Sequence, residues 1–149
     1  MKKKLHGKKQ QAGRNNPLLW GLLALLILAI PAIWLGTRNA TVSNSLPREI
    51  SVQEAATKRD AGAFILDVRQ PNEWSQYHIE GATLIPLGEL ASRVNELPRD
   101  QEIVVVCHSG NRSAKGRDIL LHAGFTRVTS MAGGLIQWQG AGYPIVSGP

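Results

Sequence analysis

The only cysteine in the chain, Cys107, lies between an apolar run and a cluster of small and polar residues. Residues 103–106 before it are β-branched and apolar, which predicts a buried strand, and the letters HSGNR follow it. A helical pattern then opens at Ser113. A thiol at the start of a helix faces unpaired backbone N–H groups and the positive end of the helix dipole, which favour the thiolate. We therefore expect Cys107 to be nucleophilic near neutral pH.

The residues after Cys107 could hold an anion beside the sulfur. Gly110 lets the backbone approach closely and adopt a positive φ, and a loop of this kind aims backbone amides at one point. Arg112 adds a fixed positive charge and a planar donor fork that suits an oxyanion. The alternative is that Cys107 is only a small buried apolar residue. We favour the functional interpretation because the glycine, the arginine and the start of the helix all lie within six residues of the cysteine.

Strand and helix patterns alternate along the part of the chain that must position this loop. Ser51 and Glu54 form a capping box, which predicts a helix running to about residue 59 or 60. Further helices are predicted over 71–74, 87–97, 113–123 and around 138, and strands over 63–66, 82–85, 103–106 and 126–130. This alternation indicates an α/β domain with a mainly parallel sheet. Ligands of such sheets bind beyond the carboxyl ends of the strands, where Asp67 and Cys107 fall.

The N-terminal residues carry the charge imbalance of the chain. Residues 1–16 contain six of the 17 basic residues and no acid, and the other 11 basic residues match the 11 acidic ones in number. The net charge of +6 therefore says nothing about the folded part. Residues 17–36 follow without a charge, and at about 1.5 Å rise per residue they would span a hydrocarbon core of roughly 30 Å. We interpret them as a transmembrane helix, and for the basic tail we favour a membrane over a nucleic-acid partner.

The basic residues also set the expected orientation of that helix. Six precede it, and only Arg38 and Arg48 follow within about fifteen residues, which predicts a cytoplasmic N-terminus. We expect a basic cytoplasmic tail (1–16), a single span of the inner cell membrane (17–36), a polar linker (37–47) and a folded domain (48–149) on the periplasmic or outer face. A signal peptide that is cleaved is the alternative.

Several separated stretches together resemble a known family. In chain order they read LDVRQPNEW from Leu66, HIEGATLIP from His78, VVVCHSGNRSA from Val104, AGF from Ala123 and AGGLIQWQGAGYPI from Ala132. Over residues 50–146 the chain is similar to a single-domain rhodanese, which is a sulfurtransferase domain. This resemblance implies a five-stranded, mainly parallel sheet flanked by helices, and a ping-pong reaction.

The resemblance also implies a role for each residue of the loop. Cys107 is the nucleophile, and its thiolate takes sulfane sulfur from a thiosulfate-like or persulfide donor and passes it to cyanide or a cellular thiol. No metal or organic cofactor is implied, since backbone amides stabilise the persulfide anion. The candidate substrate-binding residues are His108, Ser109, Gly110, Asn111, Arg112 and Ser113. Asp67, Arg69 and Glu73 are expected to shape the site through charge pairs.

Two residues depart from the family pattern. His108 stands where arginine is common, which weakens the attraction for a doubly charged donor such as thiosulfate. Its side chain is either polar lining or a proton donor to a leaving thiol, and we favour lining. Tyr77 stands where glycine is usual, and this residue puts the form of the local turn in question.

Two other functions share parts of this pattern. A cysteine-dependent phosphatase also uses a thiolate under an oxyanion loop. Such enzymes have five residues between the cysteine and the arginine, whereas four separate Cys107 from Arg112. The second alternative is a non-catalytic anchored module that binds a partner protein, and the sequence names no such partner. We favour the sulfurtransferase over both.

A single cysteine also bears on stability and on redox behaviour. No internal disulfide is possible, so the domain must be stabilised by packing. We expect Cys107 to be an exposed, reactive thiol that is prone to mixed disulfides and oxidation in an oxidising compartment.

Overall fold

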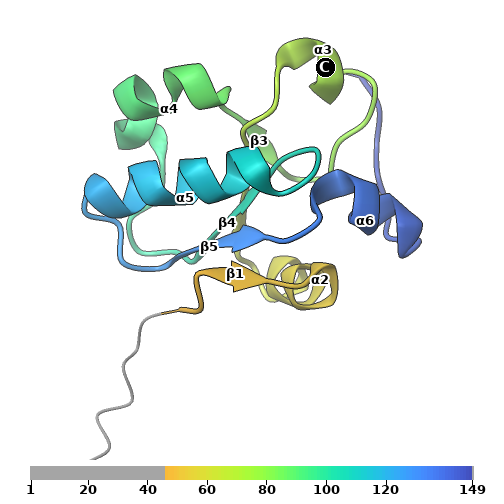
Figure 1. Ribbon diagram of the computed structural model, residues 1–149, viewed down its shortest axis with the longest axis horizontal. Coiled ribbons are helices and arrows are strands. Elements are labelled where there is room, and N and C mark those ends of the chain that lie inside the picture. The colour runs from red at the N-terminus through yellow and green to blue at the C-terminus, as the bar shows by residue number, and fades with distance from the viewer. Residues whose placement is uncertain (1–45, 149) are drawn as a thin grey trace, which may run out of the picture. The chain divides into compact units, whose positions relative to one another are not determined.

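Five parallel strands form the sheet of the described chain, with the order β1-β5-β4-β2-β3 (Figure 1). The computed structural model describes residues 46–148. The strands are β1 (Glu49–Ile50), β2 (Phe64–Asp67), β3 (Thr83–Leu84), β4 (Ile103–Val106) and β5 (Val128–Met131). This sheet confirms the predicted α/β class with five parallel strands. Because β4 is the central strand, the residue that follows it lies in the middle of the row formed by the carboxyl ends of the strands.

Helices cover both faces of this sheet (Figure 1). They are α2 (Val52–Asp60), α3 (Pro71–Trp74), α4 (Leu87–Arg93), α5 (Asn111–His122) and α6 (Gly134–Gly140), with the 3-10 turn η1 (Val94–Glu96) after α4. Apolar side chains of α2 and α6 share one buried cluster, and those of α4 and α5 share another. The domain therefore has three layers, with α2 and α6 on one face of the sheet and α4 and α5 on the other.

Strand β4 contributes to both apolar layers. Ile103 and Val105 pack in the cluster with α4 and α5, whereas Val104 and Val106 pack in the cluster with α2 and α6. All four side chains are buried. Successive side chains of a strand point to opposite faces, so a continuous apolar run is what a strand covered by helices on both faces requires.

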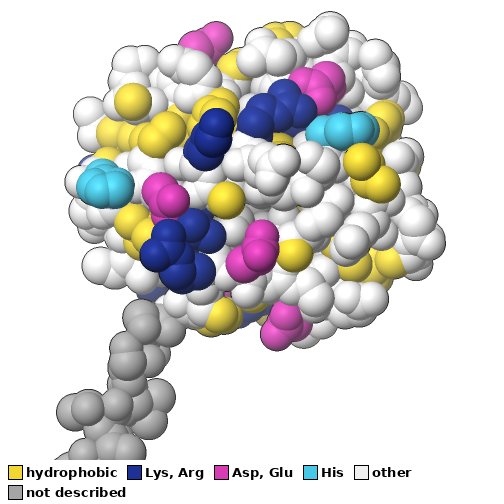
Figure 2. All heavy atoms as spheres, viewed as in Figure 1, with side chains coloured by type: hydrophobic (Ala, Val, Ile, Leu, Met, Phe, Trp, Pro, Cys, Tyr) yellow, Lys and Arg dark blue, Asp and Glu magenta, His cyan; other side chains and the backbone are white. Residues whose placement is uncertain are grey.

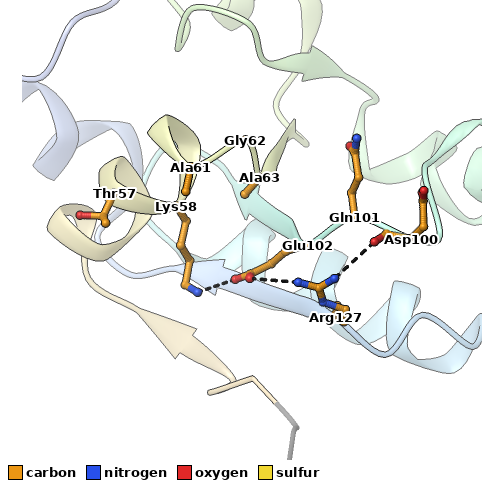
Figure 3. A pocket seen from close by; sticks show the side chains of 9 residues that line it. All are labelled: Thr57, Lys58, Ala61, Gly62, Ala63, Asp100, Gln101, Glu102 and Arg127. Atoms are coloured by element: carbon orange, nitrogen blue, oxygen red, sulfur yellow. Dashed lines mark hydrogen bonds and ion pairs between the residues drawn. The ribbon is translucent and has the colours of Figure 1, made fainter.

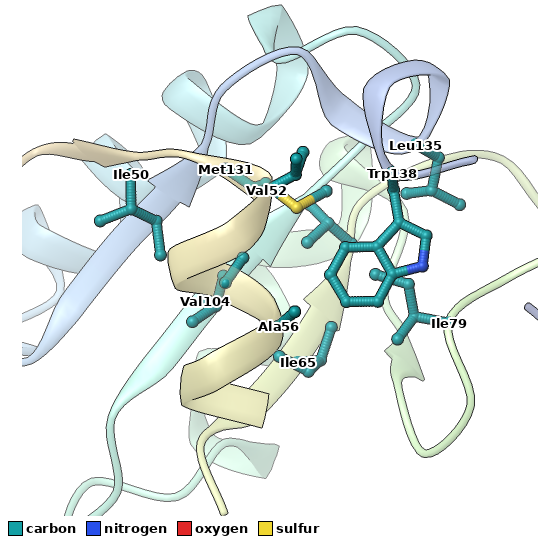
Figure 4. Close-up of a cluster of buried hydrophobic side chains, with 11 residues drawn as sticks. Ile50, Val52, Ala56, Ile65, Ile79, Val104, Met131, Leu135 and Trp138 are labelled. Carbon is teal, nitrogen blue, oxygen red and sulfur yellow. The ribbon is translucent and has the colours of Figure 1, made fainter. Parts of the chain in front are cut away.

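Trp138 of α6 fills the centre of the layer formed by α2 and α6. Figure 4 shows its indole beside α2, among the labelled side chains of Val52, Ile65, Ile79 and Leu135. Its Nε1–H donates to the carbonyl oxygen of Pro144 at 3.0 Å, which satisfies the one polar atom of a buried indole. This packing fixes α6, whose first residues contact the loop after β4.

Most predicted elements are confirmed, although the ends of several strands differ by one or two residues. The capping box is present, since the Ser51 hydroxyl accepts from the Glu54 amide at 3.2 Å and the Glu54 carboxylate accepts from the Ser51 amide at 2.9 Å. The helix predicted over 87–97 is divided into α4 and η1. The strand β1 was not predicted, because its two residues directly precede the Ser51 cap and are too few to show a periodicity. Helix α5 begins two residues earlier than predicted.

The predicted basic tail (1–16), transmembrane helix (17–36) and most of the linker (37–47) lie outside the described residues. No helix within residues 46–148 combines the length and the apolar character needed to cross a bilayer. The transmembrane prediction for residues 17–36 therefore remains a prediction.

Candidate active site

Cys107 directly follows β4, and residues 108–110 connect it to α5. The helix begins at Asn111 instead of Ser113, so Arg112 and Ser113 belong to its first turn. The cause is Gly110, which adopts a φ of 102° at the N-cap and turns the chain into the helix at once. A Cβ at this position would lie 3.2 Å from the Gly133 amide nitrogen. The loop is therefore as tight as predicted, and it requires glycine at residue 110.

The Cys107 side chain is buried, with 1% of its surface exposed, and the expectation of an exposed thiol is wrong. The side chain points inward and packs in the apolar cluster of α4 and α5. The loop residues above it, His108, Ser109 and Asn111, are exposed. The sulfur thus lies beneath the loop, and its reactivity depends on the groups that the loop aims at it.

Two polar groups approach the buried sulfur. The Gly110 amide donates to Cys107 Sγ at 3.1 Å, and Ser113 Oγ lies 3.7 Å from the same atom. The Ser113 hydroxyl donates to the Gly110 carbonyl oxygen at 2.7 Å, so its oxygen remains free to accept from a protonated thiol. When the thiol loses its proton, the Gly110 amide remains as a fixed donor to the negative sulfur.

The first turn of α5 adds further donors at the end of the same loop. The amides of Asn111, Arg112 and Ser113 have no acceptor among the residues that the structure describes. Unpaired amides and the positive end of the helix dipole favour an anion at this terminus. This arrangement can stabilise a thiolate and an anion bonded to it.

Asp67 and Arg69 form a fully buried ion pair at the end of β2. Arg69 Nη2 lies 2.7 Å from Asp67 Oδ2, and neither side chain has an exposed surface. The same guanidinium donates to the carbonyl oxygen of Tyr77 at 2.7 Å. Because buried charges are costly unless they are paired and hydrogen-bonded, these contacts fix the segment after β2. Asp67 pairs with Val106 in the sheet, so this segment lies beside the Cys107 loop.

A second ion pair joins α3 to α5. The two terminal nitrogens of Arg112 contact the two carboxylate oxygens of Glu73 at 2.6 and 2.7 Å. These hydrogen bonds lower the pKa of Glu73 from 4.5 to about 2, and they raise the pKa of Arg112. The donor fork of Arg112, which the sequence suggested for an oxyanion, is therefore occupied by Glu73. In this structure, Arg112 therefore holds the start of α5 against α3.

The two residues that depart from the family pattern lie next to each other. Tyr77 Oη is 3.5 Å from His108 Nδ1, and the Tyr77 ring centroid is 5.1 Å from the guanidinium carbon of Arg69. Tyr77 needs no left-handed conformation, since no non-glycine residue of the described chain has a positive φ. The turn before Tyr77 contains residues 75–76, and Gly81, whose φ is 78°, belongs to the next turn. Sequence reasoning treated Tyr77 only as a question of turn geometry and missed its contact with the loop.

The start of α6 holds the loop from the other side. The Leu135 amide donates to the Cys107 carbonyl oxygen at 2.8 Å, and the Ile136 amide donates to the His108 carbonyl oxygen at 3.1 Å. Gly134, with a φ of 58°, permits this approach, because a Cβ there would collide with the backbone of Cys107 and His108. Sequence reasoning did not assign Gly134 to the site. The signal for it was the glycine pair directly before an apolar helical segment.

A pocket of about 420 Å³ lies elsewhere, at the opposite ends of the strands (Figure 3). Lys58, Glu102 and Arg127 line it, and Lys58 Nζ lies 2.6 Å from Glu102 Oε1. It contains none of the predicted site residues and no thiol. Within residues 46–148, no three His, Cys, Asp or Glu side chains are grouped to hold a metal ion. The predicted site residues thus lie around Cys107, away from this pocket.

Comparison with known proteins assigns the family. Residues 51–141 match the rhodanese-like domain, and the chain belongs to this family. It is 37% identical over 107 residues to the putative sulfur carrier protein YrkF of Bacillus subtilis (strain 168), covering 70% of this chain and 57% of YrkF. It is 34% identical over 104 residues to the sulfurtransferase of Allochromatium vinosum, covering 70% of this chain and 95% of that protein.

A solved structure shows the same fold. The rhodanese-related protein of Thermoplasma volcanium is similar with a TM-score of 0.63 and 33% sequence identity, and the alignment covers 67% of this chain and 98% of that one. Together with the relatives, this similarity supports a sulfur-transfer function for the domain.

Replacing Glu73 with glutamine tests the link between α3 and α5. A folded-state pKa below the ordinary value means that Glu73 contributes stability above pH 4.5, and that this contribution falls as the pH drops toward 2. We expect Glu73→Gln to lower the free energy of unfolding at pH 7 by about 1 kcal/mol, since the pair is partly exposed. The loss should shrink between pH 4.5 and 2 in urea titrations. The exposed Glu80→Gln is the control, and an equal loss in both variants would contradict this role.

Replacing Gly134 with alanine tests the close approach of α6 to the loop. The added methyl group meets the backbone of Cys107 and His108 at a positive φ, so we expect the unfolding free energy to fall by at least about 1–2 kcal/mol. The matched control is Gly140→Ala in the same helix, where an added Cβ meets nothing within 4 Å. That variant should be neutral or more stable in the same urea titration. Similar losses in the two variants would show that the loop does not depend on this contact.

Proposed function

We propose that this chain is a membrane-anchored sulfurtransferase that carries sulfane sulfur as a persulfide on Cys107. The observation that carries the proposal is the Gly110 amide, which donates to Cys107 Sγ at 3.1 Å beside the first turn of α5. A buried sulfur with a fixed donor is suited to bear a negative charge. Membership of the rhodanese-like family supports sulfur transfer as the reaction that uses this charge.

The proposed reaction has two displacement steps. The Cys107 thiolate attacks the sulfane sulfur of the donor, a new S–S bond forms, and the old bond breaks. Its electron pair leaves with sulfite when the donor is thiosulfate, or with a thiolate when the donor is a persulfide. An acceptor thiolate or cyanide then attacks the outer sulfur and releases the Cys107 thiolate. Both steps conserve atoms and electrons without a redox partner.

The loop supplies what both steps require. The outer sulfur of the bound persulfide is an anion, and the free amides of the first turn of α5 are donors for it. His108, Ser109 and Asn111 are exposed, and we call their surface the loop entrance, because a sulfur donor would meet these residues first. No general base is required if the thiolate is already formed.

The same geometry argues against the phosphatase alternative. A phosphoryl group carries two charges and is usually met by a free arginine fork. Here both terminal nitrogens of Arg112 are engaged by Glu73, and four residues instead of five separate the cysteine from the arginine. The non-catalytic module remains as the alternative that the variants below distinguish.

We also propose that residues 17–36 anchor the domain in the inner membrane, with residues 1–16 in the cytoplasm and the domain on the periplasmic or outer face. The support is the uncharged apolar stretch itself and the excess of basic residues before it. The donor and acceptor would then be solutes or proteins of that outer compartment.

Mass measurement of the intact chain tests the persulfide. After incubation with thiosulfate, and separately with an alkyl persulfide, we expect the wild type to gain the mass of one sulfur atom. Dithiothreitol should remove it. The matched variant Cys107→Ser, which changes only the sulfur, should gain none. Failure of the wild type to gain sulfur from either donor would refute the proposal, and full function of Cys107→Ser in cells would support the non-catalytic module.

Fractionation tests the anchor. The wild-type chain should sediment with membranes and resist carbonate extraction, and its domain should be cleaved by protease added to the outer face of spheroplasts. Leu25→Arg with Leu26→Arg should release the chain, since each arginine costs about 2.5–3.5 kcal/mol at the centre of a span. Ser43→Arg in the linker adds a charge outside the span and should leave the fractionation unchanged. A wild-type chain in the soluble fraction would exclude the anchor.

A further inference from the structure

Tyr77 is held in place by the buried ion pair of Asp67 and Arg69. The Arg69 guanidinium donates to the Tyr77 carbonyl oxygen at 2.7 Å, and its carbon lies 5.1 Å from the centroid of the Tyr77 ring. Arg69 itself has no exposed surface and is fixed by Asp67. One immobile cation therefore orients both the backbone and the ring of Tyr77, through a hydrogen bond and a cation–π contact.

The hydroxyl of this ring meets the residue that follows the nucleophile. Tyr77 Oη lies 3.5 Å from Nδ1 of His108, at the long limit of a hydrogen bond. The Tyr77 hydroxyl can donate to an unprotonated Nδ1, or its oxygen can accept from a protonated one. In a neutral imidazole one nitrogen accepts and the other carries the proton. When Nδ1 accepts from Tyr77, the proton of His108 is on Nε2.

We infer that Tyr77 is a positioning residue that holds His108 as the Nε2–H tautomer, so that this N–H can donate to the leaving anion at the loop entrance. The inference rests on the proposed sulfur transfer and goes beyond it by assigning a function to both unusual residues. His108 is exposed, and the Gly110 amide rather than His108 contacts the Cys107 sulfur. The imidazole thus lies on the exposed side of the loop, where the departing part of a sulfur donor could meet it, and within the described residues it makes no hydrogen bond to the nucleophile's sulfur.

The groups around His108 favour a neutral N–H over a free cation as the hydrogen-bond donor to a departing anion. The two arginines of this region are committed, Arg69 to Asp67 and Arg112 to Glu73. Figure 2 shows the same mixing of charge on the face that it draws, where basic side chains lie next to acidic ones. A departing anion at the entrance thus depends on N–H donors more than on a free cation.

The same argument predicts which class of sulfur donor reacts faster because of this N–H. As the Cys107 thiolate forms its new S–S bond, the old bond breaks and negative charge grows on the leaving atom, which the His108 Nε2–H stabilises without giving up its proton. A thiolate is a stronger base than sulfite and therefore a poorer leaving group, so its departure gains more from an N–H that stabilises the developing charge. The pair of Tyr77 and His108 therefore favours persulfide donors that leave as thiolates. Since this interaction grows in the transition state, it acts on kcat more than on KM.

Nitrogen NMR of the full chain tests the tautomer without relying on activity. With ¹⁵N-histidine at a pH where the ring is neutral, the wild type should show a protonated Nε2 and an acceptor Nδ1 for His108, and His108→Gln identifies the signal by its loss. Tyr77→Phe keeps the ring on Arg69 and removes only the hydroxyl, so the signal should move toward the tautomer mixture of a free imidazole. The control Tyr143→Phe, which removes the hydroxyl of the other tyrosine, should leave it unchanged. Identical His108 spectra in wild type and Tyr77→Phe would overturn the inference.

Kinetics with two donors test the consequence. We expect Tyr77→Phe to lower kcat for an alkyl persulfide about two- to tenfold, the effect of one hydrogen bond, with a smaller effect for thiosulfate and little change in KM. In the His108→Gln background Tyr77→Phe should have no further effect. A loss of the same size in that background, or an equal loss with both donors, would overturn the inference. If the wild type takes up no sulfur at all, the proposed function fails, and the NMR spectra still decide whether Tyr77 positions His108.

Discussion

A sulfur atom that is buried in an apolar cluster can bear a negative charge only if fixed donors reach it. In this domain the donor in contact is the Gly110 amide, and the other conditions of the site follow from that contact. The amide can point at the sulfur because Gly110 adopts a left-handed conformation and α5 starts immediately afterwards. The loop can close this tightly because α6 binds the carbonyl oxygens of Cys107 and His108. Residues 110 and 134 must therefore be glycine for steric reasons, because a side chain at either position would disturb the loop that directs the amide at the sulfur.

The two ion pairs near the site act on its frame. Asp67 and Arg69 are fully buried, and such a pair is favourable only when its geometry and its remaining hydrogen bonds are satisfied, as they are here. Glu73 and Arg112 are partly exposed and join the short helix α3 to the first turn of α5. Since α3 has only four residues and no buried side chain, this pair compensates for packing that the helix lacks. These four charged side chains are thus paired with one another and fix the elements around Cys107.

Local sequence signals were enough for the frame of the fold and for the place of Cys107. These signals are the apolar run of β4, the Ser51 capping box and the residues at the strand ends. Each involves only residues that are close in the sequence, so each could be recognised from the sequence alone. Contacts between distant segments could not be read in this way. Three features depend on which elements become neighbours in the fold. They are the pairing of β1 with β5, the ion pair of Arg112 with Glu73 and the burial of Cys107. Tyr77 and His108 are 31 residues apart, and the pairing of β2 with β4 brings the segments that carry them side by side.

This last contact changes how the departures from the family pattern are understood. Taken singly, a histidine in place of arginine removes a charge, and a tyrosine in place of glycine adds bulk to a turn. Together they form one unit, because the tyrosine hydroxyl meets the imidazole and the tyrosine ring lies on a guanidinium that cannot move. A free arginine would attract any anion through its charge, whereas an oriented N–H discriminates by the basicity and position of its acceptor. In the proposed reaction, the loop around Cys107 would hold the sulfur and the pair of Tyr77 and His108 would favour one class of sulfur donor. The pair could then change while Cys107 and the amides around it stay the same.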